Sequence, residues 1–117
     1  MEKSIEFYAK LLGMKLLSRR EIPHNNAEIA FLQDAESKGA QLELTFYRAQ
    51  KIFQQADYEN RIFDHLAFEV KDMKETISAM RKTGATITDE PFRLSPKGSL
   101  LAFVEDPDAT LIELIQK

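Results

Sequence analysis

The stretch Ser99–Ile115, SLLAFVEDPDATLIELI, decides the fold of this chain. Two short apolar runs, Leu100–Val104 and Leu111–Ile115, flank a polar segment around Pro107, and both proline and aspartate favour turns. Apolar runs of this length on either side of a turn predict a β-hairpin. Glu113 interrupts the second run, and a carboxylate there must stay hydrated, find a partner or bind a metal.

The composition is that of a globular protein, with 44% hydrophobic and 30% charged residues in a chain of 117. A chain of this length fits one domain that buries roughly two-thirds of its unfolded surface. No apolar run approaches the about 20 residues that span a bilayer, and no signal-peptide pattern is present. Cysteine is absent, which excludes disulfides and thiol nucleophiles and fits a reducing cytoplasm. The net charge of -3 disfavours a nucleic-acid partner. Together with the two preceding observations, it leads us to expect a cytoplasmic protein without nucleic-acid or membrane partners.

The first half of the chain predicts a helix followed by three strands. Apolar residues at helical spacing predict a helix over Ser4–Leu12, and Gly13 is placed to end it in the left-handed conformation. The three predicted strands are Met14–Glu21, Ala27–Leu32 and Ala40–Phe46.

The second half predicts a strand, a helix and three more strands. The first strand is Ile62–Val70, and Asp72 with Glu75 resembles a capping box that opens a helix ending at Gly84. The other strands are Ala85–Glu90 and the two of the hairpin, with Pro91–Gly98 as a loop and the polar stretch Tyr47–Arg61 as a connector between the halves.

The two halves form an internal repeat, which bears on any assignment of the fold. Glu113 follows Glu43 by 70 residues and Gly84 follows Gly13 by 71, in the same order of elements. The second half has an extra strand with His65 before its helix, and its counterpart would precede the chain as given. We therefore expect the first half to begin one strand late.

Glu43 and Glu113 are equivalent in this repeat, and His65 belongs to a third strand. One imidazole and two carboxylates suit a divalent ion such as Zn, Ni, Co, Mn or Fe. A single glutamate on a strand is usually solvated, and a single histidine usually only forms hydrogen bonds, but the repeat favours a metal site. We expect His24 and Glu69 to lie at the surface, and Phe7 and Tyr8 to pack in the core.

At these residues the sequence resembles glyoxalase I (lactoylglutathione lyase), a family of the vicinal oxygen chelate superfamily. The segments that resemble it are EKSIEFYAKLLGMKLL, LELTF, DHLAFEV and AFVEDPDATLIEL, between Glu2 and Gln116. The resemblance implies an α+β fold of paired βαβββ modules, which form a curved mixed sheet around a metal cleft. The single domain would comprise a first module at 1–47 without its first strand, a connector at 48–61 and a second module at 62–117.

The resemblance also implies the site. Glu43, His65 and Glu113 would bind a divalent metal, Ni or Zn, and Glu113 would be the catalytic base. Tyr47 follows a position where glyoxalases contact glutathione, and Lys97 lies where they have a basic loop, so both are predicted to bind substrate.

The implied activity is isomerisation of the hemithioacetal of methylglyoxal and a thiol such as glutathione to the S-lactoyl thioester. The alternatives are another vicinal oxygen chelate enzyme (an epimerase, thiol transferase or dioxygenase) or a metal-free small-molecule-binding protein of the same fold. Glu43 favours glyoxalase over the other enzymes, and retention of Glu43, His65 and Glu113 disfavours a protein that only binds ligands.

The expected missing strand has two consequences. The first helix would begin uncapped at Met1, and the family's fourth ligand, a histidine or glutamine, would be absent. We therefore expect the chain as given to have a weakened or vacant metal site and little lyase activity, both regained by a chain extended upstream. The exposed strand edge should favour a homodimer.

Overall fold

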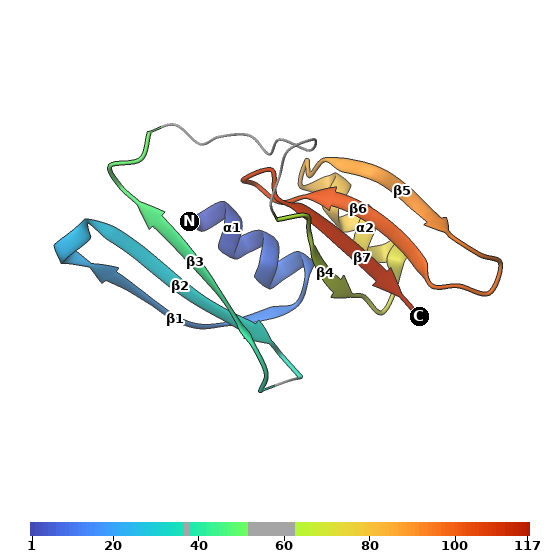
Figure 1. Ribbon diagram of the computed structural model, residues 1–117, viewed down its shortest axis with the longest axis horizontal. Helices are drawn as coiled ribbons and strands as arrows, with labels where there is room; N and C mark the ends of the chain where they lie inside the picture. Colours follow the sequence, from blue (N-terminus) through green and yellow to red (C-terminus); the bar gives the residue numbers. More distant parts are fainter. Residues whose placement is uncertain (37, 52–62) are drawn as a thin grey trace. The chain divides into compact units, whose positions relative to one another are not determined.

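The computed structural model describes residues 1–36, 38–51 and 63–117, which belong to two compact units, Met1–Gln54 and Gln55–Lys117 (Figure 1). Of the predicted connector Tyr47–Arg61, positions 52–61 lie outside the described residues, and Tyr47 belongs to a strand. None of the helices described is long and apolar enough to cross a membrane.

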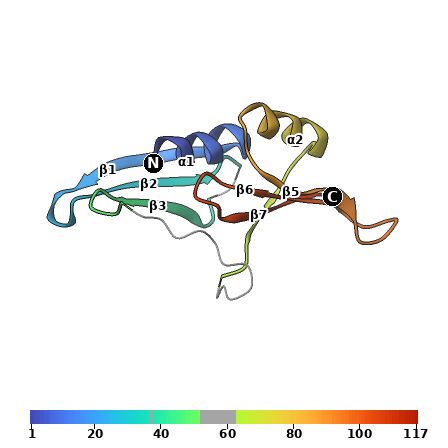
Figure 2. The same ribbon diagram turned by 90° about the horizontal axis from the view of Figure 1, so that it is seen from above.

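The first unit is a helix on a three-stranded antiparallel sheet. Figure 2 shows the helical segment lying along one face of the sheet. The sheet has the order β1-β2-β3. In chain order the elements are α1 (Glu2–Glu6), the π-helix η1 (Phe7–Leu11), β1 (Met14–Ile22), the 3₁₀-helix η2 (Pro23–Asn25), β2 (Ala27–Asp34) and β3 (Gln41–Tyr47).

The predicted helix Ser4–Leu12 is present, but it begins at Glu2 and its second half is a π-helix. Phe7 and Tyr8 are buried with their ring centroids 5.3 Å apart in a T-shaped contact, which confirms them as packing residues. Apolar spacing over little more than one turn does not separate the α-helical from the π-helical hydrogen-bond pattern. Met1 provides no side-chain cap, as predicted.

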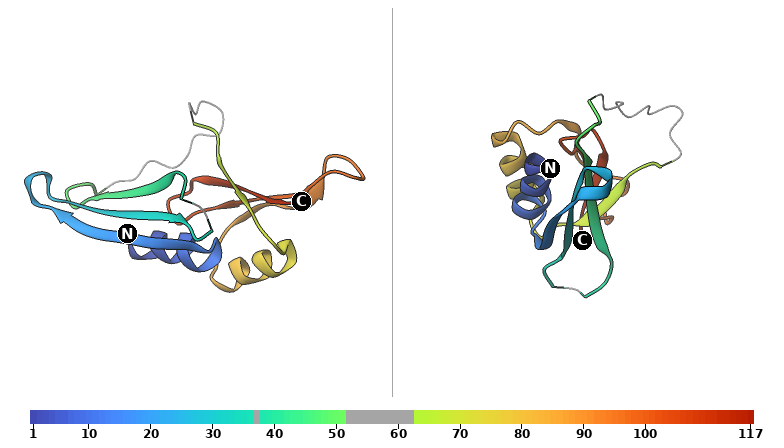
Figure 3. Two further views of the ribbon diagram at one scale, coloured as in Figure 1. Left: turned by 90° about the horizontal axis from the view of Figure 1, so that it is seen from below. Right: turned by 90° about the vertical axis from the view of Figure 1, so that its left-hand side faces the viewer.

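The second unit is a four-stranded sheet of order β4-β7-β6-β5 with one helix on a face (Figure 3). Strand β4 runs parallel to β7, and the other pairs are antiparallel. The elements are β4 (Leu66–Glu69), α2 (Met73–Lys82), β5 (Ile87–Arg93), β6 (Leu100–Glu105) and β7 (Leu111–Gln116).

Helix α2 follows the prediction. The Asp72 carboxylate accepts a hydrogen bond from the Glu75 backbone N–H at 2.9 Å, which satisfies one of the free donors of the first turn. The apolar side chains of α2 are buried together with Ile112 and Leu114, which are 0% exposed. Because successive residues of a strand face opposite sides, Glu113 lies on the face of the sheet away from α2.

The predicted boundaries of β4 and β5 are wrong, and β5 begins at Ile87 rather than at Ala85. Within the described residues, the strand predicted at Ile62–Val70 is shorter and begins at Leu66. The segment predicted as a loop from Pro91 instead continues β5 as far as Arg93. Proline has no N–H for a central ladder, but β5 is an edge strand whose register shifts between Asp89 and Phe92, and there proline is tolerated.

The hairpin of β6 and β7 is confirmed. Its turn is organised by Asp106, whose Oδ1 accepts hydrogen bonds from the backbone N–H groups of Asp108 at 2.9 Å and Thr110 at 2.8 Å. Ala109 closes the turn with φ +63°, a left-handed conformation in which its Cβ is strained.

Replacing Ala109 by glycine should therefore stabilise the protein. Relief of the left-handed strain is worth about 1–2 kcal/mol, and the greater freedom of glycine in the unfolded chain offsets about half of it. We expect the free energy of unfolding to rise by roughly 0.5–1 kcal/mol in a urea titration. Equal or lower stability would show that the turn does not strain Ala109.

Candidate metal and catalytic site

Each unit places its glutamate in the same way. In the first sheet Glu43 of β3 lies opposite Phe31 of β2, and in the second Glu113 of β7 lies opposite Phe103 of β6. The internal repeat inferred from sequence is therefore present as a matching strand register in the two units.

His65 and Glu113 meet within the second unit. His65 immediately precedes β4, and the parallel register sets Ala67 of that strand beside Glu113 of β7. The two side chains lie with His65 Nε2 3.2 Å from Glu113 Oε2. The Glu113 side chain is only 17% exposed and that of His65 is 31% exposed, so both are partly shielded from water.

The second ring nitrogen of His65 also has a hydrogen-bond partner. His65 Nδ1 lies 2.6 Å from Asp64 Oδ1. The Phe103 ring meets the imidazole edge-to-face, with centroids 5.6 Å apart, and Phe92 stacks on Phe103 at 6.4 Å. Asp64 was not among the predicted site residues, although an acidic residue directly before a candidate ligand was a visible signal.

The distance between His65 Nε2 and Glu113 Oε2 fits two ligand atoms of one divalent ion. Nitrogen and oxygen ligands lie about 2.0–2.2 Å from zinc, so two ligands of one ion are roughly 3 Å apart. The 3.2 Å between His65 Nε2 and Glu113 Oε2 matches that separation. Across residues 1–36, 38–51 and 63–117, no group of three or more His, Asp or Glu side chains that could hold a metal is found. The structure thus shows two of the three predicted ligands together.

Glu43, the third predicted ligand, is an exposed residue of the first unit. Its Oε1 accepts a hydrogen bond from Thr45 Oγ1 at 3.2 Å. Arg19, which is paired with Ala30, forms an ion pair with Glu2 of α1, so these side chains mark the helix-covered face. Glu43 precedes Leu44, the β3 residue paired with Ala30, so its side chain points to the opposite face of the sheet. Glu113 likewise lies on the face of its own sheet that is away from the helix.

The remaining sequence candidates lie at the surface. Tyr47 ends β3 on the same face as Glu43 and is 46% exposed, and Lys97 is exposed in the turn between β5 and β6. Glu69, which is paired with Lys117 at 2.5 Å, and His24 are exposed as predicted.

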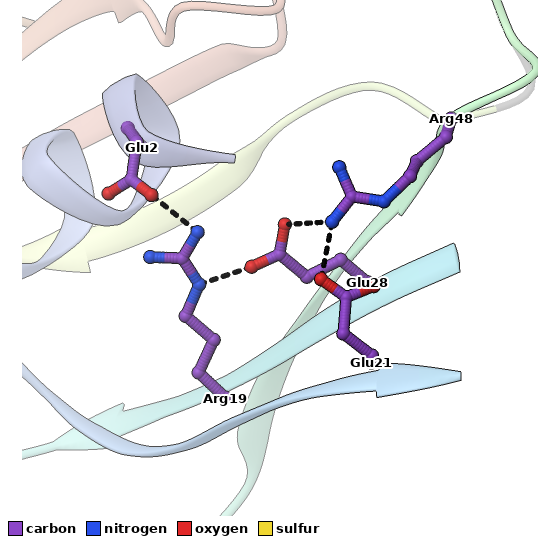
Figure 4. Close-up of polar contacts among 5 residues, drawn as sticks. All are labelled: Glu2, Arg19, Glu21, Glu28 and Arg48. Atoms are coloured by element: carbon purple, nitrogen blue, oxygen red, sulfur yellow. Dashed lines mark hydrogen bonds and ion pairs between the residues drawn. The ribbon is translucent and has the colours of Figure 1, made fainter. Parts of the chain in front are cut away.

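A second polar cluster, which was not predicted from the sequence, lies in the first unit (Figure 4). Arg19 joins Glu2 to Glu28, and Arg48 joins Glu28 to Glu21. The Glu28 side chain is only 9% exposed, and the hydrogen bond from Arg19 holds its pKa below the ordinary value. The same bond, with that to Glu2, raises the pKa of Arg19. Because these groups lie on the helix-covered face, the cluster ties α1 to the sheet and is separate from the face of Glu43.

The two units repeat a helix on a β-sheet, with a glutamate at the same register of the last strand, so the chain belongs to the class of α+β proteins built from repeated modules. A family model described as the Glyoxalase/Bleomycin resistance protein/Dioxygenase superfamily matches residues 1–114. The chain belongs to this family.

Known proteins agree with this assignment. A probable lactoylglutathione lyase of Vibrio cholerae is 38% identical over 99% of the chain and 82% of the relative. A trypanothione-dependent glyoxalase I of Leishmania major has a TM-score of 0.79 at 32% identity, over 99% of this chain and 78% of that one. A glyoxalase I mutant of Zea mays has a TM-score of 0.84 at 29% identity over 99% of the chain. The chain spans 40% of the length of the Zea mays and other plant proteins it matches.

Proposed function

We propose that this chain is a metal-dependent lyase of the glyoxalase I type. Its substrate would be the hemithioacetal of methylglyoxal and a thiol such as glutathione, and its product the S-lactoyl thioester. The observation that supports this best is the pair His65–Glu113, which sets an imidazole nitrogen 3.2 Å from a carboxylate oxygen. The Vibrio cholerae and Synechocystis relatives, 38% and 36% identical, are named probable lactoylglutathione lyases.

The metal of this proposal is Ni or Zn, with Glu43, His65 and Glu113 as its protein ligands. A bound divalent ion supplies Lewis-acid stabilisation of the negative charge that develops on two neighbouring substrate oxygens. The ligand set contains no thiolate, since the chain has no cysteine, and therefore suits a borderline or hard ion.

Glu113 is proposed to move the proton. Its carboxylate would accept the proton from the carbon that bears sulfur and return it to the adjacent carbon. The hydroxyl proton of the first carbon would end on the oxygen of the second, so the step is an isomerisation that needs no oxidant or reductant. Its partial shielding, at 17% exposure, limits exchange of that proton with water. Tyr47 and Lys97 are proposed to bind the thiol part of the substrate, Lys97 by its exposed positive charge.

The test uses the whole chain, stripped of metal with a chelator and then loaded with Ni or Zn. We expect a low rate of thioester formation from methylglyoxal with glutathione or trypanothione, and only after metal is returned. Turnover that is unaffected by the chelator would contradict the metal requirement, and no turnover with either thiol would contradict the lyase assignment. We further propose a cytoplasmic location, in keeping with the absence of cysteine.

A homodimer is proposed from the edge of the first sheet. Strand β7 has β4 beside it, whereas its equivalent β3 has no strand on its outer edge among the residues described. An open edge presents unpaired backbone groups that a second copy can cover. Sedimentation analysis should show a dimer, and a monomer that persists at high protein concentration would contradict this proposal.

A further inference from the structure

We propose that Asp64 positions His65 for metal binding by holding the proton of the imidazole on Nδ1. Asp64 directly precedes His65 in the sequence and is not itself a proposed ligand. This inference rests on the proposed metal-dependent function and deepens it.

The two contacts of the ring decide where its proton lies. A neutral imidazole has one N–H, and the hydrogen bond made by one nitrogen determines the state of the other. Nδ1 is 2.6 Å from the Asp64 carboxylate, whereas Nε2 is 3.2 Å from Glu113. The shorter, charge-assisted contact favours the proton on Nδ1. A divalent ion bound between Nε2 and Glu113 would take the place of any proton shared there, and the lone pair of Nε2 would then be a ligand of the ion.

The ring has little freedom to leave this orientation. Phe103 meets it edge-to-face at an interplanar angle of 88°, and the Phe92 ring stacks on that of Phe103. Rotation of the imidazole would give up the aromatic contact and the Asp64 hydrogen bond together. Asp64 and Phe103 therefore fix the ring at two points, and Nε2 is left for the ion.

Loss of such an outer partner typically weakens metal binding by 10–100-fold. The Asp64 side chain is 69% exposed, so water competes for its hydrogen bond. We therefore expect an effect near the lower limit, about tenfold.

The experiment compares Asp64→Ala and Asp64→Asn with Asp34→Asn, which removes the same charge from the exposed end of β2 in the first unit. The full chain has two histidines, so ¹⁵N NMR of the metal-free protein can follow the His65 ring with His24 as an internal reference. Titration with Ni or Zn alone then gives the dissociation constant, and thermal unfolding without metal shows that each variant is folded.

We expect wild type to hold the proton on Nδ1 and Asp64→Ala to shift it toward Nε2, with about tenfold weaker metal binding. The amide oxygen of Asp64→Asn can still accept the Nδ1 proton, so this variant should keep the tautomer and lose less affinity. Asp34→Asn should match wild type in both measurements.

An unchanged tautomer or an unchanged affinity in Asp64→Ala, with wild type binding metal, would overturn this inference and leave the proposed function standing. A wild-type chain without metal affinity would overturn both. A loss of affinity in Asp34→Asn equal to that in Asp64→Asn would also overturn the inference, because net charge alone would then explain the effect.

Discussion

The variant Glu113→Gln should remain folded and lose hemithioacetal turnover by about 10²–10⁴-fold, the range that a general base contributes. Glutamine keeps the size of the side chain and one oxygen near His65 Nε2. It cannot accept a proton from carbon, so the step assigned to Glu113 would have no base.

The matched control is Glu69→Gln, which makes the same change on β4, next to β7. Glu69 is paired with Lys117 at 2.5 Å and its side chain is 60% exposed, so turnover should stay near that of wild type. Bound metal is measured for both variants at saturating Ni or Zn, which separates loss of the base from loss of a ligand. Near-normal turnover in metal-loaded Glu113→Gln would exclude Glu113 as the base.

The variant Glu28→Gln should lower the free energy of unfolding by about 2 kcal/mol at neutral pH. Removing one partner of a fully buried ion pair costs about 3–5 kcal/mol, because the remaining charge is left uncompensated. Here Arg19 and Arg48 are 36% and 43% exposed, so water offsets part of that cost. Urea titrations of wild type and variant measure the difference.

The difference should depend on pH in a defined direction. The pKa of Glu28 is lowered in the folded protein from an ordinary value of 4.5, chiefly by the hydrogen bond from Arg19. Its stabilising contribution is therefore complete above the unfolded pKa and is lost as the pH falls through the folded pKa. The difference in the free energy of unfolding between wild type and Glu28→Gln should be constant near neutral pH and should decrease below pH 4.5.

Glu6→Gln is the control for this prediction. Glu6 forms an exposed pair with Lys10 at 2.8 Å, and exposed pairs of this kind add little to stability. Equal stability of wild type and Glu28→Gln at neutral pH would show that the cluster around Glu28 is not a source of stability.

The features predicted correctly from sequence are those set by local patterns. The strands that carry Glu43 and Glu113 were predicted, and both are present as β3 and β7, because short runs rich in apolar residues between turn residues favour strands. Gly13 and Gly84 end their helices at φ +70° and +79°, since glycine adopts this conformation without strain. The hairpin followed from its turn residues.

The features that sequence did not predict depend on partners distant in the chain. The start of β4 is set by its parallel pairing with β7, and Pro91 is tolerated because β5 lies at an edge. Glu28, an acid in an apolar strand like Glu113, was a visible signal, but its arginine partners come from β1 and the end of β3. Asp64 acquires its role only through the orientation of His65.

The parallel pairing of β4 with β7 also bears on the order of folding. It joins the first and last strands of the second unit, with α2, β5 and β6 between them in the chain. Contacts between distant segments must overcome the entropy of closing a long loop, and they tend to form slowly. We expect His65 and Glu113 to meet only when the rest of this unit is in place. The rate at which a refolding chain binds metal would then report the last step of folding. The rate at which helix α2 forms would report an early step.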